Sequence, residues 1–449
     1  MISVEFTHIS PEELSTWLSD LIKIDTTNPP GNEIKVVDYI RDLLDNEGIA
    51  YQILAKDKTR ANIFIHLPGT SGSCKLLLSG HLDVVPAEKD SWQVPPFSGN
   101  TINDEIWGRG ALDCKGLVVM ILAVLIEIHR SDIVLRHDLN ALFLADEEVQ
   151  GEYGAKYITD TYPELLQTDY LINEAGGMLI EQNGKKLFLL NNAEKGSFAG
   201  EIFVKGRPGH GSIPKTADNS LKYSSIIVQR LLSHQTEITA SEEVLDQIEL
   251  MGGGKLGRFI FSQPFLARFF LNHPVGPLKE ITPIIDAMLR PTITPTMISG
   301  SDKINVIPGA SRIGIDCRLL PGQDWQTVED ELARALHGLD YTLIQLFPET
   351  VSGTASSIDP DFNQAIQKTL DDFYPDTTIV PYLTMGATDM RYFRTSFGIP
   401  SYGIMPLIID DIDEFSEMFH GRDERIHKNN LEFGAKFLYL LISNLSIIE

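Results

Sequence analysis

The N-terminal part of the chain alternates amphipathic helical patterns with short apolar runs. A helix is predicted from Pro11 to about Ile24, because Ser10 can cap it and proline suits the first helical position. A second helix, which Asn32 can cap, keeps its apolar residues at helical spacing until Gly48. Short strands are expected at Tyr51–Leu54, Ala61–Leu67, Leu76–Leu78, Leu139–Ala145 and Tyr170–Ile172. Such alternation is typical of an α/β domain.

One apolar stretch, Leu117–His129, predicts a helix between the strands Leu76–Leu78 and Leu139–Ala145. It supplies the crossover that two parallel strands need. Glu127 interrupts its apolar run, which is too short to span a bilayer. We therefore expect a buried helix in a mostly parallel sheet.

The pattern changes after Lys195. Further strands are expected at Phe198–Val204, Ser311–Leu319 and Tyr341–Leu346, and helices at Leu221–Leu232 and Gln326–Leu339. Two helices and about four strands predict a small α+β domain inserted into the first one. The predicted division is therefore 1–195 with 355–449 for the catalytic domain and 196–354 for the insert, with helices Pro360–Phe373 and Asn429–Leu445 closing the chain.

The segment Ser241–Ser299 is longer than such an insert requires. Its PFLARFFLNHPVGPLKEI stretch is rich in Phe, Leu and Pro. It is either a helical cap on the insert or part of a substrate wall, and the structural role is favoured because large exposed apolar patches are uncommon.

Composition narrows the possible functions. A length of 449 residues favours two domains, and the formal charge of -25 disfavours a nucleic-acid partner. Three cysteines (Cys74, Cys114 and Cys317) argue against a disulfide framework and fit a reducing compartment. The first residues show neither a basic nor an apolar signal region, so we expect a cytoplasmic protein without a membrane partner.

Candidate metal ligands follow the predicted strands. His81 and Asp83 follow Leu76–Leu78, and strand ends at one edge of a parallel sheet are neighbours. The candidate ligands are two imidazoles and three carboxylates: His81, Asp113, Glu148, Glu174 and His420. Five such side chains can hold two Zn²⁺ ions if one carboxylate bridges them. Asp113 is the expected bridge, because it lies in a glycine-rich turn.

Two further carboxylates have expected roles beside the ligands. Asp83 lies two residues past His81, on the same face of an extended chain, and can accept the other ring N–H of that histidine. Glu147 is expected to be the general base toward water and later the acid toward the leaving nitrogen. Cys114 could be a nucleophile, but nothing nearby except the expected metals would depress its pKa.

Ordered motifs along the chain resemble a known family. They are SGHLDVVP, WGRGALDCKG, ADEEVQG, NEAGG, GRPGHGS, NVIPG, DCR, MGATD and HGRDE. Together they resemble the zinc aminoacylase/carboxypeptidase family, which includes acetylornithine deacetylase, succinyl-diaminopimelate desuccinylase, aminoacylase, carboxypeptidase G and carboxypeptidase S. The resemblance implies a phosphorylase/hydrolase-like catalytic domain, a ferredoxin-like lid or dimerisation domain, and two divalent ions, with Zn expected and Co or Mn possible.

The resemblance also implies a division of the ligands. The resemblance implies that His81, Asp113 and Glu174 are the ligands of one zinc. It implies that Asp113, Glu148 and His420 are the ligands of the other. Glu147 matches the catalytic carboxylate of the family. A cis peptide bond is implied between the bridging Asp113 and the next residue.

On the insert, the resemblance implies residues that bind the substrate. The histidine matching His210 reaches a catalytic site, commonly across a dimer interface, and helps to stabilise the oxyanion. Asn305, Arg318 and the Gly386 loop match residues that hold the substrate carboxylate, for which a guanidinium fork is suited. A structural salt bridge is the alternative for Arg318.

The expected function is hydrolysis of an amide or peptide bond to an amino acid with a free carboxylate. The enzyme would be an N-acyl-amino acid amidohydrolase or a carboxypeptidase/dipeptidase, acting on small molecules or short peptides as a homodimer joined through the lid. An aminopeptidase is the alternative within the same chemistry. A catalytically silent dimeric scaffold or binding protein is the alternative from another class.

Overall fold

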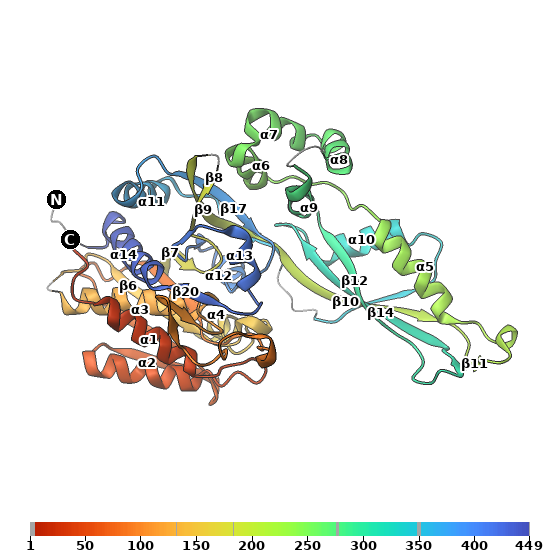
Figure 1. Ribbon diagram of the computed structural model, residues 1–449, viewed down its shortest axis with the longest axis horizontal. Coiled ribbons are helices and arrows are strands. Elements are labelled where there is room, and N and C mark those ends of the chain that lie inside the picture. Colours follow the sequence, from red (N-terminus) through yellow and green to blue (C-terminus); the bar gives the residue numbers. More distant parts are fainter. Residues whose placement is uncertain (1–4, 132, 183, 275–277, 348–351, 449) are drawn as a thin grey trace. The chain divides into compact units, whose positions relative to one another are not determined.

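The computed structural model describes residues 5–131, 133–182, 184–274, 278–347 and 352–448, which fall into two compact units. Unit 1 consists of Met1–Asn192, Ser356–Tyr382 and Thr388–Glu449. Unit 2 consists of Ala193–Ala355 and Leu383–Ala387. Among the helices in the described ranges, none has the length and apolar character needed to cross a membrane. Figure 1 shows the elements of each unit.

Unit 1 is built on a mixed sheet whose centre is parallel, so the predicted α/β class is confirmed. The strands lie in the order β1-β2-β6-β3-β7-β18-β9-β8-β19. Strand β3 pairs in parallel with both β6 and β7, and β7 pairs in parallel with β18. The bounds are β1 Tyr51–Asp57, β2 Arg60–Leu67, β3 Cys74–His81, β6 Asp138–Leu144, β7 Thr168–Asn173, β8 Met178–Gln182, β9 Lys185–Glu194, β18 Ser401–Gly403 and β19 Leu407–Ile409.

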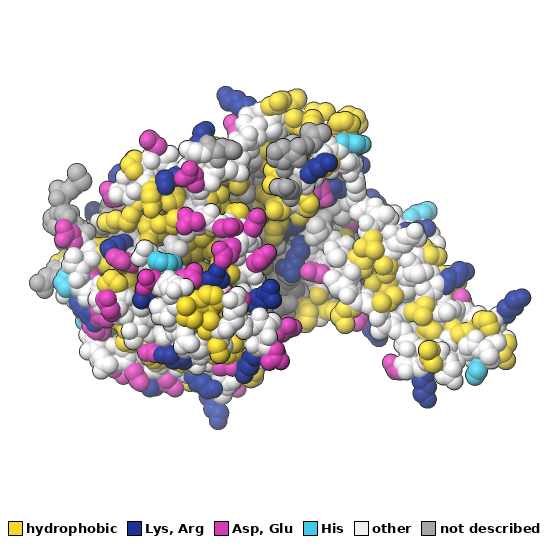
Figure 2. All heavy atoms as spheres, viewed as in Figure 1, with side chains coloured by type: hydrophobic (Ala, Val, Ile, Leu, Met, Phe, Trp, Pro, Cys, Tyr) yellow, Lys and Arg dark blue, Asp and Glu magenta, His cyan; other side chains and the backbone are white. Residues whose placement is uncertain are grey.

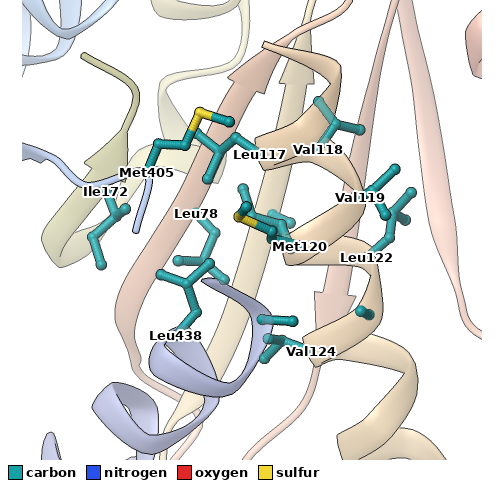
Figure 3. Close-up of a cluster of buried hydrophobic side chains, with 14 of the residues drawn as sticks. Leu78, Leu117, Val118, Val119, Met120, Leu122, Val124, Ile172, Met405 and Leu438 are labelled. Atoms are coloured by element: carbon teal, nitrogen blue, oxygen red, sulfur yellow. The ribbon is translucent and has the colours of Figure 1, made fainter. Parts of the chain in front are cut away.

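Helix α3 (Lys115–Arg130) lies in the core of unit 1, as its sequence predicts. Every residue from Lys115 to Ile128 is buried. Figure 3 shows its apolar side chains against Leu78 of β3 and Leu438 of α14. Glu127 is tolerated there because its carboxylate accepts the backbone N–H groups of residues 7, 8 and 9 at 2.8–2.9 Å. The other helices of unit 1 are α1 Pro11–Lys23, α2 Ile34–Glu47, α4 Ala155–Thr161, α11 Pro360–Phe373, α12 Met390–Phe397, α13 Ile412–Met418 and α14 Lys428–Asn444.

The start of α2 differs from the prediction. Asn32 does not cap the helix; it adopts a left-handed φ of 70°, and the N-cap position is Glu33, whose side chain makes no capping hydrogen bond. The Glu33 carboxylate is instead bound by Arg60 of β2 through two hydrogen bonds of 2.7 Å. A long-range ion pair therefore overrides the local capping signal.

A small separate sheet joins distant parts of unit 1. Its strand β5 pairs with β20 and β4, which places residues 425–427 beside residues 105–107. The bounds are β4 Thr101–Ile102, β5 Glu105–Trp107 and β20 Arg425–His427. This pairing brings the HGRDE motif to the glycine-rich turn that carries Asp113.

Unit 2 is an α+β unit with an antiparallel sheet in the order β12-β14-β10-β15. Helices α5 and α10 pack on one face of this sheet, in a core that includes Ile227, Val328 and Ile313. The bounds are β10 Gly196–Lys205, β12 Thr292–Ser299, β14 Ala310–Leu319, β15 Thr342–Gln345, α5 Ser220–Ser233 and α10 Trp325–Ala335. A short β11 (Gly209–His210) pairs with β13 (Val306–Ile307). Strands β16 (Thr354–Ala355) and β17 (Thr378–Thr384) both pair with β9.

The extra segment of unit 2 forms a helical group followed by a strand. The helices are α6 Glu242–Ile248, α7 Gly254–Ser262, α8 Pro264–Asn272 and α9 Leu278–Leu289. They enclose a core of their own, which also includes Leu383. The segment is thus largely helical, and its last residues form β12, the fourth strand of the sheet.

Candidate metal centre

The topology of unit 1 brings three predicted ligand segments to one edge of the sheet. His81 is the last residue of β3 and lies opposite Leu144, the last residue of β6. Glu148 follows β6 after a short turn, and Glu174 follows directly after β7, the other parallel neighbour of β3. Parallel strands present their carboxyl ends together, so these side chains converge.

All five expected ligands lie in one cluster. The Nε2 atom of His81 is 2.9 Å from Oδ1 of Asp113 and 3.2 Å from Oε2 of Glu174. The Nε2 atom of His420 is 3.1 Å from Oδ2 of Asp113 and 3.3 Å from Oε2 of Glu148. Asp113 therefore directs one carboxylate oxygen toward each histidine, which is the arrangement that a bridging ligand requires.

The turn that carries Asp113 is held by a buried carboxylate that sequence reasoning did not single out. Glu424 accepts the backbone N–H groups of Gly110 at 3.1 Å, Leu112 at 2.7 Å and Asp113 at 3.0 Å. It also pairs with Arg109, whose Nη1 lies 2.8 Å from Oε2. The peptide bond after Asp113 is cis, as the resemblance implied.

Asp83 supports the cluster in two ways, one of which differs from the prediction. Its main-chain oxygen, at 2.9 Å, is the nearer partner of His81 Nδ1, while its carboxylate lies 3.6 Å away. The carboxylate instead accepts the backbone N–H groups of Glu147 at 3.1 Å and Glu148 at 3.2 Å. Asn28 donates to the same carboxylate at 2.8 Å. Asp83 thus positions the loop of the two glutamates as well as the histidine.

The electrostatics of the cluster reflect crowded carboxylates. Burial raises the pKa of Glu174 to about 7, and burial together with the charge of Glu174 raises the pKa of Glu147 well above its ordinary value. Hydrogen bonds to Asp113 and Glu148 raise the pKa of His420 to about 10. Burial opposes ionisation of Asp113, yet the hydrogen bonds from His420 and His81 lower its pKa.

This donor set fits divalent metal ions. Nitrogen and carboxylate ligands suit Zn²⁺, and the carboxylates outnumber the two imidazoles that could neutralise them. Oε1 of Glu148 is buried without a hydrogen-bond partner among the described residues. The groups that could hold an ion include His81 with Asp113 and Glu148, and His81 with Cys114 and Glu174. Cys114 is a weak ligand candidate, because burial raises the pKa of its thiol.

Asp389 is a further carboxylate near the cluster that the sequence did not single out. It is buried, its Oδ1 has no hydrogen-bond partner among the described residues, and burial raises its pKa to about 8. It belongs to the MGATD motif, as Glu424 belongs to HGRDE, whereas Asn28 lies outside the motifs named above. Membership in those motifs was the available signal for Asp389 and Glu424.

The expected substrate-binding residues of unit 2 lie in three places. His210 is exposed at the β11–β13 pair, with Nδ1 2.7 Å from Oγ of Ser212. Asn305 is next to it, since its carbonyl accepts the N–H of Gly211 at 2.9 Å. Arg318 lies near the other end of β14 and pairs with Asp316 at 3.0 Å, where both side chains are partly exposed.

The two ends of β14 are well separated. Ala310, at the end near β13, precedes Arg318 by eight residues, which corresponds to about 27 Å of strand. Gly386 is a half-buried bend residue in the Leu383–Ala387 segment of unit 2. The structure therefore groups His210 with Asn305 and places Arg318 apart from them.

Comparison with known proteins agrees with this site. The sequence profile of peptidase family M20/M25/M40 matches residues 77–444. The chain is 31% identical over 395 residues to the N-fatty-acyl-amino acid synthase/hydrolase PM20D1 of Mus musculus, covering 82% of this chain and 73% of that protein.

Two solved structures share the fold. The M20 family metallo-carboxypeptidase Sso-CP2 from Sulfolobus solfataricus superposes with a TM-score of 0.72 at 17% identity, covering 97% of this chain and 99% of that one. The YXEP protein of Bacillus subtilis, described as a dinuclear metal binding peptidase from the M20 family, gives a TM-score of 0.59 at 13% identity, covering 96% and 97%. The motifs, the fold and the profile together establish that this chain belongs to peptidase family M20/M25/M40 and is a hydrolase of amide or peptide bonds.

Proposed function

We propose that the protein is a two-metal hydrolase that cleaves the amide or peptide bond to an amino acid with a free carboxylate. The observation that carries the proposal is the placement of Asp113, with one carboxylate oxygen toward His81 and the other toward His420. A single chain could hold two divalent ions in this way. The substrates would be N-acyl amino acids, dipeptides or the C-terminal residues of short peptides.

In this proposal each of the two ions is held by one histidine and by the carboxylates nearest to that histidine. His81, Asp113 and Glu174 would hold one ion, and Glu148 and His420 would share Asp113 for the other. When bound, two Zn²⁺ ions, or Co²⁺ or Mn²⁺ in their place, would lower the pKa of a water molecule and polarise the scissile carbonyl. The Asp83 main-chain oxygen would keep the ring of His81 in the required tautomer.

Glu147 is assigned as the general base. Its raised pKa supports this role, because a carboxylate with a pKa closer to neutrality accepts a proton from water more readily. The same carboxyl group would then donate that proton to the leaving nitrogen. Its position is supported by the hydrogen bond from its backbone N–H to Asp83 at 3.1 Å.

For the substrate carboxylate we assign Arg318, Asn305 and the Gly386 loop, and for the oxyanion His210. The separation of about 27 Å along β14 supports a homodimer joined through unit 2. A dipeptide cannot contact both ends of that strand in one copy. Each site would therefore take His210 and Asn305 from one copy and Arg318 from the other, so that both groups contact the same substrate.

Glu147→Gln tests the catalytic assignment. We expect the turnover number to fall by a factor of about 10²–10⁴, with the metal content unchanged by elemental analysis, since Glu147 is assigned as base and not as ligand. Glu152→Gln is the matched control, because Glu152 is an exposed glutamate in the same loop that pairs with Lys56. Loss of metal in Glu147→Gln would contradict the assignment. Wild-type protein without near-stoichiometric metal and without chelator-sensitive hydrolysis would favour a silent scaffold.

A substrate panel tests the specificity. It contains an N-acyl amino acid, the same compound with its carboxylate converted to an amide, and a dipeptide with a free amine. A long-chain acyl member belongs in the panel, because the mouse relative is described as acting on N-fatty-acyl amino acids. We expect the amide analogue to be a poor substrate. Turnover of the free-amine dipeptide alone would favour an aminopeptidase.

A further inference from the structure

The helical group of unit 2 exposes a large apolar surface on α7 and α8. These helices bury one face, which includes Phe261 and Leu271, in the core of the group. Their other face carries large apolar side chains with high exposed fractions: Leu256 70%, Phe259 58%, Phe265 82% and Phe269 53%. Figure 2 shows hydrophobic side chains gathered over α7 and α8. Contiguous exposed patches of this kind mark interaction surfaces.

The stretch that forms α7 and α8 differs in charge from the chain as a whole. Residues 250–279 contain no Asp or Glu, in a chain with 62 acidic and 37 basic residues. Lys255, Arg268 and Lys279 are exposed within this stretch. Arg258 is neutralised by ion pairs with Glu242 and Asp246. The exposed face of α7 and α8 therefore carries apolar side chains together with Lys255 and Arg268, while the acidic residues Glu242 and Asp246 of α6 lie against Arg258.

The cations lie on the same helical faces as the exposed rings. Lys255 precedes Phe259 by four residues on α7, and Arg268 follows Phe265 by three on α8. Side chains three or four residues apart share one side of a helix. A planar surface that contacts the phenyl rings of Phe259 and Phe265 would therefore also contact the charged groups of Lys255 and Arg268.

We propose that α7 and α8 dock this protein on the surface of an anionic lipid bilayer. Phe259, Phe265 and Phe269 would enter the boundary between headgroups and acyl chains, and the nearby cations would contact lipid phosphates. Because the net charge of the chain is -25, attraction to an anionic surface would have to come from these cations and from burial of the rings. The sequence-based expectation of no membrane partner rested on the lack of a spanning segment, and docking requires none.

A lipid surface suits the patch better than a second copy of the chain does. Two copies that met through this patch about a twofold axis would bring the cations of one against the same cations of the other. Such like-charge contacts are unfavourable, whereas phosphate groups neutralise them. The inference is independent of the catalytic proposal, because its test measures binding and not turnover.

Vesicle sedimentation with the full chain tests the inference. Wild-type protein is mixed with phosphatidylcholine vesicles, with or without phosphatidylglycerol, at low and at physiological ionic strength. We expect binding to the phosphatidylglycerol vesicles that weakens with salt. Phe265→Ser with Phe269→Ser should lower the partition coefficient at least about tenfold, since burial of one phenyl ring alone is worth that factor. Arg268→Glu should lower it about fivefold or more.

The matched control is Leu232→Ser on α5, which removes an apolar side chain of similar exposure, 70%, outside the cationic stretch. We expect its partition coefficient to equal that of wild type. Near-ultraviolet circular dichroism and the melting temperature check that each variant is folded. The inference is overturned if wild type does not bind the anionic vesicles, or if the double phenylalanine variant binds them equally well. It is also overturned if sedimentation equilibrium shows a dimer that the double variant dissociates, without vesicle binding.

Discussion

The buried pair of Glu424 and Arg109 offers a quantitative test of how the metal centre is supported. Glu424→Gln keeps the shape of the side chain but removes its charge from beside a guanidinium that is itself buried. Removing one partner of a buried ion pair costs about 3–5 kcal/mol. Burial also raises the pKa of Glu424, so its ionised form is already disfavoured and part of that loss is offset. We therefore expect a loss of about 3 kcal/mol in the free energy of unfolding of unit 1.

The same variant should weaken metal binding. The amide cannot accept all three backbone N–H groups that hold the turn of Asp113, and supporting groups of this kind are worth about 10–100-fold in metal affinity. Urea unfolding in the presence of a chelator measures the first effect, and titration of Zn²⁺ into metal-free protein measures the second.

Glu105→Gln is the control for this experiment. Glu105 pairs with Arg425 at 3.2 Å on the small sheet nearby, but the pair is partly exposed and should contribute less than about 1 kcal/mol. If Glu424→Gln resembled Glu105→Gln in both measurements, the support assigned to Glu424 would be refuted.

Two further predictions concern the metal-free protein and the ligand turn. The pKa of Glu174 is raised to about 7 from an ordinary value of 4.5, so in metal-free protein this group should contribute its full stabilisation below about pH 4.5 and lose about 1–3 kcal/mol of it as the pH rises through 7. Chelated samples of wild type and Glu174→Gln melted across this range would show it, and an equal pH dependence of the two melting temperatures would contradict it. Gly110→Ala should cost about 1–3 kcal/mol, because Gly110 has a φ of 92° and a Cβ would lie 3.0 Å from side-chain atoms of Lys115 and Val84. Gly72→Ala is the control, because Gly72 has a φ of 65° and a Cβ there would have no atom within 4 Å, so its loss of unfolding free energy should be smaller. Equal losses for the two variants in urea unfolding would show that the contacts with Lys115 and Val84 contribute nothing.

The parts of the site that could be predicted from sequence are those with a local signal. His81 and Glu174 each follow a short apolar strand, and strand ends on a parallel sheet meet by geometry. Helix α3 was predictable because its residues are apolar on all sides. Glu424 could not be given its role, since its partners lie more than 300 residues away.

Long-range contacts also explain the errors. Asn32 has the side chain of a cap, but the pair of Glu33 with Arg60 decides how α2 begins. Strand β12 contains Pro295 and lies at the edge of its sheet, where proline is tolerated, so its sequence gives only a weak strand signal. The exposed phenylalanines of α7 and α8 have the three- and four-residue spacing that is typical of the buried face of a helix. The sequence alone therefore does not indicate which face of these helices packs against the core.

The dispersal of the metal cluster along the chain has a consequence for biosynthesis. Glu174 and His420 are separated by 246 residues, and both segments of unit 2 lie between them. At a translation rate of about 5–20 residues per second, a ribosome needs about 12–50 s to make that stretch. During this interval the nascent chain holds three carboxylate ligands and one imidazole, but lacks His420 and the Glu424 that fixes the Asp113 turn. In the proposed two-metal enzyme, the full ligand set would therefore be complete only after unit 2 has been synthesised.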